Sequence, residues 1–180
     1  MRKQSLVFAL VLMGFALFQQ SCGVKKQSAG EQLSLAFYNL ENLFDTLDDP
    51  AINDEEFLPG TKKDWNSARY VLKLAHLAHV NDSLQPGETG ILGLCEIENE
   101  AVLQDLNRQL KHTYQIYTVP SPDARGIDVG LLIKGSIEHQ ELIQKAFVFS
   151  DEPTMRTRNL HISRLKWNAK TLLVAVCHMP

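Results

Sequence analysis

The sequence predicts an α/β protein in which mixed β-sheets form layers and helices pack outside them. Apolar runs of strand length recur along the chain, and segments with helical periodicity separate the first of these runs. The last third of the chain consists mostly of further strands. The composition, with 44% hydrophobic and 22% charged residues, excludes a disordered or collagen-like chain. The 180 residues suffice for one domain with a sizeable core.

The N-terminal segment predicts export. Arg2 and Lys3 precede an uncharged apolar run over residues 6–18, and polar or small residues follow as far as Ser21. The run is too short for a comfortable membrane-spanning helix. We therefore interpret residues 1–21 as a secretory signal peptide.

Cys22 follows this segment directly and resembles the lipidated cysteine of bacterial lipoproteins. The resemblance implies a lipid anchor and a flexible tether over residues 22–32. It also implies that the protein lies in the bacterial cell envelope, as an outer-membrane, periplasmic or extracellular lipoprotein attached to the membrane through its lipid. The alternative is an ordinary signal peptide followed by a cysteine that occurs there by chance.

The first expected strand covers residues 33–38, a short apolar run that is rich in aromatic side chains. Residues 45–56 carry six acidic side chains around Pro50 and are expected to form a loop. Calcium binding by this loop is disfavoured, because the spacing does not fit an EF-hand and the glycine of that pattern is missing. A solvated acidic loop is the better interpretation.

Helical periodicity predicts one helix over residues 65–82, with Asp64 as its N-cap, and a second helix that follows an Asn99 cap. The first is expected to bury a face that includes Trp65, Val71 and Leu72. The other expected strands, identified by apolar or alternating runs, cover residues 90–95, 114–119, 127–133, 142–149, 159–167 and 171–176.

Asn39, Glu96 and His178 each follow an apolar strand, where functional side chains can be held at the rim of a rigid sheet. A glutamate directly behind a buried run is costly unless it is paired or bound to metal, and Mg²⁺ needs only one or two carboxylates. Alternatively, Glu96 surfaces at the strand end and caps the next turn. His178 could protonate a leaving oxygen, with Asp128 orienting it, or it could be an ordinary core or surface histidine.

Four segments occur in the order expected of the endonuclease/exonuclease/phosphatase superfamily, which has the deoxyribonuclease-I-like fold. They cover residues 36–44 (AFYNLENLF), 93–99 (GLCEIEN), 125–132 (RGIDVGLL) and 174–180 (VAVCHMP). The resemblance covers residues 33–180 and implies a layered β-sandwich with outer helices. We expect this sandwich to be incomplete, because the chain stops at Pro180, before the Gly-Asp-Phe-Asn segment and the C-terminal Asp-His pair of the family. Residues 33–180 would then be the N-terminal portion of the domain.

The resemblance also implies a metal-dependent phosphoester hydrolase, a nuclease or phosphatase that acts on phosphodiesters. Glu96 would bind Mg²⁺ or Mn²⁺, Asn39 would orient the phosphate, and His178 would act as the general acid, polarised by Asp128. Phosphate oxygens would be held by Arg125 and by Arg158, or by Arg156 in its place.

The substrate would be a nucleic acid, a lipid headgroup or a sugar phosphate. The net charge of −3 gives no basic footprint for tight nucleic-acid binding. We expect the full-length family member to be the enzyme and the 180-residue chain alone to be inactive. The alternative function is a catalytically inactive, lipid-anchored binding or scaffold fragment of the same fold.

Overall fold

The computed structural model describes residues 31–179. The predicted signal peptide, Cys22 and the tether as far as residue 30 lie outside the described residues. Among residues 31–179, no helix is both long enough and apolar enough to cross a membrane.

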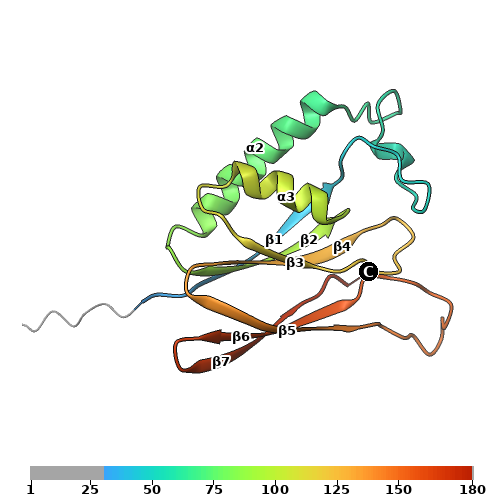
Figure 1. Cartoon of the computed structure of the whole chain (residues 1–180). Helices are drawn as coiled ribbons and strands as arrows, with labels where there is room; N and C mark the ends of the chain where they lie inside the picture. The colour runs from blue at the N-terminus through green and yellow to red at the C-terminus, as the bar shows by residue number, and fades with distance from the viewer. Residues whose placement is uncertain (1–30, 180) are drawn as a thin grey trace, which may run out of the picture. The chain divides into compact units, whose positions relative to one another are not determined.

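The described residues form two β-sheets with helices on one side (Figure 1). The larger sheet has the strand order β1-β2-β4-β3, formed by Ser34–Leu43, Gly90–Ile97, Asp128–Lys134 and Gln115–Thr118. Only the β1–β2 pair is parallel within it, and the other neighbours are antiparallel. The smaller sheet is antiparallel and has the order β5-β6-β7, formed by Ile137–Lys145, Leu160–Trp167 and Lys170–Val176. The predicted α/β class of layered sheets and outer helices is confirmed.

Residues 31–179 also contain the helices α2 (Ser67–Leu84) and α3 (Glu100–Gln109) and the short 3-10 helix η1 (Glu55–Phe57). Asn99 caps α3 as predicted, because its side chain accepts a hydrogen bond from the backbone N–H of Val102. The predicted Asp64 cap of α2 is wrong. The helix begins two residues later than expected, and its cap is Asn66, which accepts from the backbone N–H of Arg69.

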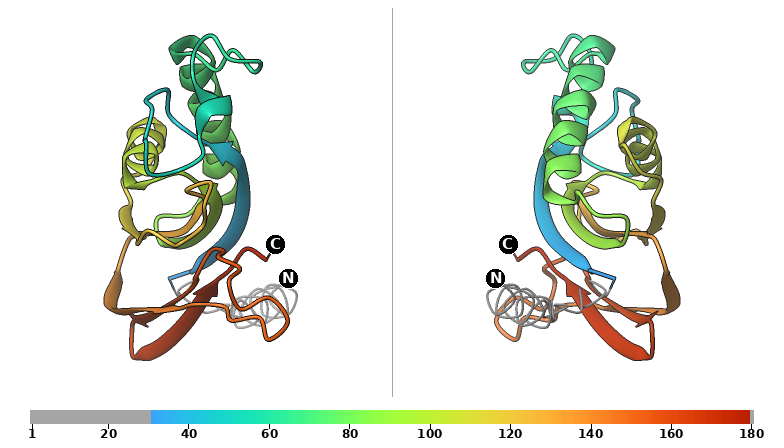
Figure 2. Two further views of the ribbon diagram at one scale, coloured as in Figure 1. Left: turned by 90° about the vertical axis from the view of Figure 1, so that its right-hand side faces the viewer. Right: turned by 90° about the vertical axis from the view of Figure 1, so that its left-hand side faces the viewer.

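Apolar side chains form two core layers on opposite faces of the larger sheet. Figure 2 shows the elements on either side of this sheet, with the helices on one side and the smaller sheet on the other. The first layer lies between this sheet and the helices and includes Leu74, Leu92 and Leu103. The second lies between the two sheets and includes Ile91 and Leu165. Strands β2 and β4 are covered on both faces, which explains why both read as nearly continuous apolar runs.

The predicted buried face of α2 is wrong in part, since Trp65 is buried as expected but Val71 and Leu72 are not. The helix buries Tyr70, Leu74, Leu77, Ala78 and Asn81, whereas Val71 and Leu72, which we expected inside, are more than half exposed. The expected periodicity started at Trp65, a residue that precedes the helix and packs on Phe57. Because Trp65 lies in the preceding loop, a helical pattern that starts at this residue is out of phase with the buried face of α2.

Strand β5 differs from the strand expected over residues 142–149. It starts at Ile137, only two residues after β4 and its Gly135 turn, and ends at Lys145. The strand does not show as an apolar run in the sequence, because its outer face is exposed and carries polar residues such as Glu138 and Glu141. Its pairing with β6 also shifts register between His139 and Glu141, which interrupts the alternation of side chains.

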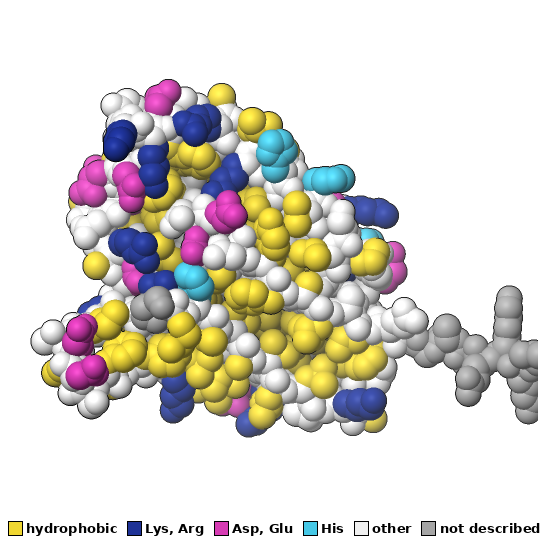
Figure 3. Space-filling model, turned by 180° about the vertical axis from the view of Figure 1, so that it is seen from behind, with side chains coloured by type: hydrophobic (Ala, Val, Ile, Leu, Met, Phe, Trp, Pro, Cys, Tyr) yellow, Lys and Arg dark blue, Asp and Glu magenta, His cyan; other side chains and the backbone are white. Residues whose placement is uncertain are grey.

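Strands β1 and β7 are edge strands, and no strand among the described residues pairs with their outer edges. An apolar groove of about 340 Å³ lies between them, lined by Leu35, Phe37, Gly93, Val174 and Val176. Leu35 and Phe37 are more than half exposed there. On the face shown in Figure 3, hydrophobic side chains gather in a broad band across the lower half of the picture.

Candidate functional site

Glu96 lies at the end of β2 in a strained backbone conformation, with φ at 59°. The pairing of β2 with β4 shifts register at this point, between Cys95 and Ile97. Both oxygens of the Glu96 carboxylate accept hydrogen bonds, Oε1 from Asn39 Nδ2 at 2.9 Å and Oε2 from the backbone N–H of Asn42 at 2.9 Å. A non-glycine residue with positive φ at a bulge is typical of a functional site, where the bulge redirects a side chain.

Strand β1 carries a matching bulge beside Glu96. Glu41 and Asn42 have φ angles of 52° and 59°, and the pairing of β1 with β2 shifts register between Asn39 and Leu43. The backbone N–H of Glu41 donates to Asn39 Oδ1 at 2.7 Å, an Asx turn. Because Oδ1 is occupied in this way, the amide nitrogen of Asn39 is the atom that faces Glu96. The bulge thus fixes both donors to the carboxylate.

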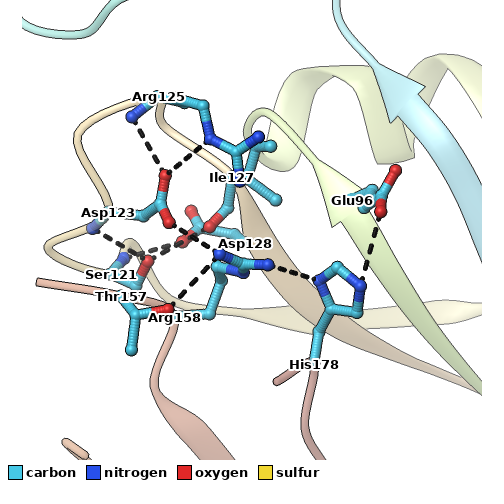
Figure 4. Close-up of polar contacts among 9 residues, drawn as sticks. All are labelled: Glu96, Ser121, Asp123, Arg125, Ile127, Asp128, Thr157, Arg158 and His178. Atoms are coloured by element: carbon cyan, nitrogen blue, oxygen red, sulfur yellow. Dashed lines mark hydrogen bonds and ion pairs between the residues drawn. The ribbon is translucent and has the colours of Figure 1, made fainter. Parts of the chain in front are cut away.

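His178 lies just beyond the end of β7 and joins Glu96 to a second group of charges (Figure 4). Its Nε2 lies 3.4 Å from Glu96 Oε1, and its Nδ1 lies 2.9 Å from Nη2 of Arg158. Burial lowers the pKa of the imidazole, and the positive charge of Arg158 lowers it further, whereas Glu96 acts in the opposite direction. The net effect is a pKa of His178 below its ordinary value.

Arg158 is buried in an ion pair with Asp123, whose Oδ2 accepts from Arg158 Nη1 at 3.0 Å. The other oxygen of Asp123 accepts from the backbone N–H of Arg125 at 2.9 Å, and the Arg125 side chain is more than half exposed. Arg158 is therefore a buried residue that orients the imidazole of His178. Arg125 is the arginine that remains open to solvent at this edge, while exposed Arg156 donates to carbonyls of its own loop.

Asp128 does not contact His178 in this structure, although we expected it to orient the imidazole. Asp128 lies at the start of β4 and accepts from the backbone N–H of Ser121 at 2.8 Å. The carboxyl group is buried, and burial raises its pKa to about 6. Both nitrogens of His178 face other residues instead, so the role of Asp128 here is to tie the preceding loop to the strand.

The structure thus brings four of the predicted residues together at one edge, namely Asn39, Glu96, His178 and Arg158. Arg158, which we expected to hold phosphate, is buried there between Asp123 and His178. Sequence reasoning missed Asp123 and the backbone N–H of Asn42. No pattern marks either of them, because a loop aspartate and a main-chain donor acquire their roles only through tertiary contacts.

Among residues 31–179, no group of three or more His, Cys, Asp or Glu side chains could hold a metal ion. The donor set at this edge is a single carboxylate, Glu96, whose orientation is fixed by two hydrogen bonds and whose side chain is 17% exposed. That set fits Mg²⁺, which in proteins takes one or two carboxylates and completes its coordination with water and substrate phosphate. It does not fit a structural zinc site, which requires four protein ligands.

The two bulges thus hold a carboxylate beside a histidine at one edge of a layered α/β fold. A family model described as the Endonuclease/Exonuclease/phosphatase family matches residues 34–180. The chain belongs to this family, as its four sequence segments predicted. Its fold is therefore that of a family of phosphoester hydrolases.

Two crystal structures of TDP2 from Caenorhabditis elegans are similar to the chain. The selenomethionine form has 16% sequence identity and a TM-score of 0.44, and the match covers 61% of this chain and 30% of that one. The other form has 15% identity and a TM-score of 0.41 and covers 61% of this chain and 31% of that one. The chain therefore spans less than a third of the length of either. No curated protein matches the sequence.

Proposed function

We propose that the protein is a metal-dependent hydrolase of phosphodiester bonds, of the nuclease or phosphatase type. One observation carries the proposal: the Glu96 carboxylate is held by Asn39 and by the Asn42 N–H, within 3.4 Å of His178, in a chain of this family. Such an arrangement fixes a carboxylate that can bind a metal ion beside an imidazole that can transfer a proton. Fixed positions of this kind favour hydrolysis of a phosphoester.

Glu96 is the residue that would hold the divalent ion, Mg²⁺ or Mn²⁺. The hydrogen bonds from Asn39 and Asn42 occupy one position on each oxygen, and a carboxylate oxygen has further lone pairs for a cation. When bound, the ion stabilises negative charge on the phosphoryl oxygens.

The other residues would act on the phosphate and the leaving group. Asn39 orients Glu96 and, at the rim of the sheet, the phosphate. Arg125 has the exposure needed to bind a phosphoryl oxygen. His178 carries its proton on Nε2, the nitrogen that faces Glu96. To act as a general acid, it must take a second proton on Nδ1, so Arg158 has to leave that nitrogen during the reaction.

The substrate class that the family implies is a phosphate-containing compound such as a nucleic acid. The net charge of −3 favours recognition of a local phosphate group over broad electrostatic attraction to a polyanion. A lipid headgroup or sugar phosphate satisfies the same requirement.

We also propose export and anchoring in the bacterial envelope through Cys22. The proposal rests on the apolar run of residues 6–18 and on the position of the cysteine behind it. A lipid with two acyl chains on Cys22 would hold the domain at a membrane surface, since a single chain alone gives only marginal attachment.

The test is hydrolysis of bis(p-nitrophenyl) phosphate by the complete protein, with Mg²⁺ or Mn²⁺ added and with EDTA in place of metal. Release of nitrophenol that requires metal is the expected result. If the folded protein shows no metal-dependent turnover on this diester or on p-nitrophenyl phosphate, the hydrolase proposal is overturned. The binding or scaffold function then takes its place.

A further inference from the structure

Lys73 on α2 reaches across to the bulge of β1 and binds two of its carbonyl groups. Its Nζ donates to the carbonyl oxygen of Glu41 at 2.5 Å and to that of Asn42 at 3.0 Å. These are the two residues with positive φ, and the N–H of Asn42 is one of the two donors that hold Glu96. Lys73 is thus linked to the Glu96 carboxylate through one turn of backbone.

The bulge benefits from such support, because left-handed conformation costs about 1–2 kcal/mol for a residue such as Glu41, although an asparagine such as Asn42 adopts it more readily. A cationic donor that binds both carbonyls stabilises the turn in this geometry through charge-assisted hydrogen bonds. The local bonds from Glu41 N to Asn39 and from Phe44 N to Asn42 O are short-range and neutral. Lys73 connects the turn to helix α2, a distant rigid element.

Lys73 is itself held in place by its surroundings. Its Nζ lies 5.5 Å from the centre of the Trp65 ring, and the Trp65 indole N–H donates to the carbonyls of Phe44 and Asp45. Burial lowers the pKa of Lys73, which the charges of Glu41 and Glu96 oppose. Lys73 and Trp65 together bind four carbonyl groups at the end of β1.

We propose that Lys73 is a positioning residue of the hydrolytic site. By fixing the Glu41–Asn42 turn, it keeps the Asn42 N–H and the Asn39 amide directed at Glu96, and it touches neither substrate nor metal. Its effect on the turn does not depend on the proposed function, whereas its effect on metal binding and turnover rests on it.

The first test measures the turn directly. Lys73→Met keeps an unbranched side chain beside Trp65 but removes the donor, and Lys62→Met, at an exposed lysine with no side-chain hydrogen bond or ion pair among the described contacts, removes the same charge nearby. Amide hydrogen exchange by NMR should show the Asn42 N–H exchanging at least tenfold faster in Lys73→Met. Amides within α2, such as that of Leu77, should be unchanged in both variants. Equal protection of Asn42 in all three proteins would overturn the proposal.

The second test measures the site. In the complete protein, Mn²⁺ titrations with and without a phosphodiester should show metal affinity about tenfold weaker in Lys73→Met, as expected when an outer-shell contact is lost. Lys73→Arg keeps a cationic donor and should restore most of the affinity, and Lys62→Met should bind like the parent. A reduced melting temperature in Lys73→Met with unaltered metal affinity would show that Lys73 only stabilises the fold.

A third variant separates positioning from loss of charge. Glycine adopts positive φ without penalty, so adding Asn42→Gly to Lys73→Met should recover part of the lost metal affinity. If the double variant recovers no metal affinity and Lys62→Met loses as much affinity as Lys73→Met, the effect is due to charge and the proposal is overturned. If Asn42 exchange responds as expected but no variant hydrolyses any phosphoester, the proposed function fails and the structural role of Lys73 stands.

Discussion

Arg158 donates a hydrogen bond to Nδ1 of His178 across 2.9 Å. A guanidinium has only donors, so Nδ1 must be the accepting nitrogen and the imidazole proton must lie on Nε2. Nε2 is the nitrogen that faces Glu96, at 3.4 Å. The buried arginine thus sets the tautomer of the histidine and presents an N–H to the carboxylate that would hold the metal.

The charges behind His178 predict opposite effects on its pKa. Arg158 lowers this pKa and Asp123 raises it, so Arg158→Met should raise the pKa of His178 and Asp123→Asn should lower it. NMR titration of the imidazole nitrogens in metal-free protein measures both shifts. A change in the same direction in both variants would contradict the assigned roles. Arg158→Met should also weaken the preference for the Nε2–H tautomer, which Glu96 alone would then favour.

The Arg158–Asp123 pair predicts a non-additive effect on stability. Both side chains are less than 10% exposed, so removing either partner alone leaves a buried charge without compensation. Arg158→Met should reduce the free energy of unfolding by about 3 kcal/mol or more. The double variant with Asp123→Asn should recover a large part of this loss. Urea unfolding of the parent, both single variants and the double variant gives the coupling energy, and simple additivity would show that the pair is not coupled.

Glu98 predicts that stability falls as pH rises toward neutrality. Burial is the main cause that raises its pKa from 4.5 to about 7, and the charges of Asp45, Asp54 and Asp49 add to this effect. Between these two values the folded state binds more protons than the unfolded state, so the free energy of unfolding decreases with increasing pH.

Glu98→Gln removes this titration. It should therefore stabilise the protein at pH 8 by about 2 kcal/mol, a difference that should vanish near pH 4.5. Unfolding by urea at both pH values checks the sign. Glu100→Gln is the control, because Glu100 lies nearby at the exposed start of α3. A variant of Glu98 that is less stable at pH 8 than the parent would contradict the prediction.

The predictable part of the site consists of residues that interrupt a strong pattern. Asn39, Glu96 and His178 are polar groups at the ends of apolar strands, so the strand pattern itself marks them. Asp123 could not be found in this way, because it is a loop residue whose partner lies 35 positions away. The expected Asp128–His178 pair failed for the same reason: sequence order does not show which buried charge faces the imidazole.

The fold shows the same division. Strands β2 and β4 were predictable because both faces are buried and nearly every position between the strand ends is apolar. The buried face of α2 was not, because its apolar side chains surround the helix and its rotation is set by contacts with the sheet. Exposed Val71 and Leu72 are as hydrophobic as buried Leu74 and Leu77. Contacts with the sheet therefore determine which of these side chains are buried, and the sequence of the helix alone does not predict it.

Cys22→Ser tests the proposed lipid anchor. A serine hydroxyl cannot take the thioether-linked lipid, so the variant should move from the membrane fraction to the soluble fraction of the cell. Fractionation followed by immunoblotting measures this shift, with Cys177→Ser as the control because Cys177 lies at the other end of the chain. An unchanged distribution would replace lipid anchoring by plain secretion.

Glu96→Gln and His178→Ala should separate metal binding from proton transfer in the complete protein. Glu96→Gln keeps the shape of the side chain but removes the charge that attracts the dication. Hydrolysis of a phosphodiester should fall by about two orders of magnitude or more, because charge stabilisation by the metal contributes several kcal/mol. Folding should survive, since the change also relieves the cost of a buried charge.

His178→Ala removes the acid instead of the metal ligand, so magnesium affinity should hold while turnover drops. The drop should be smaller for substrates with good leaving groups such as nitrophenolate, which need no proton to depart. Two variants, a magnesium titration and two substrates of different leaving-group pKa provide the comparison. Full activity of Glu96→Gln at low magnesium would show that Glu96 is an ordinary strand-end residue. Equal losses of His178→Ala on both substrates would assign the imidazole to orienting Glu96, through the same Nε2–H that Arg158 imposes.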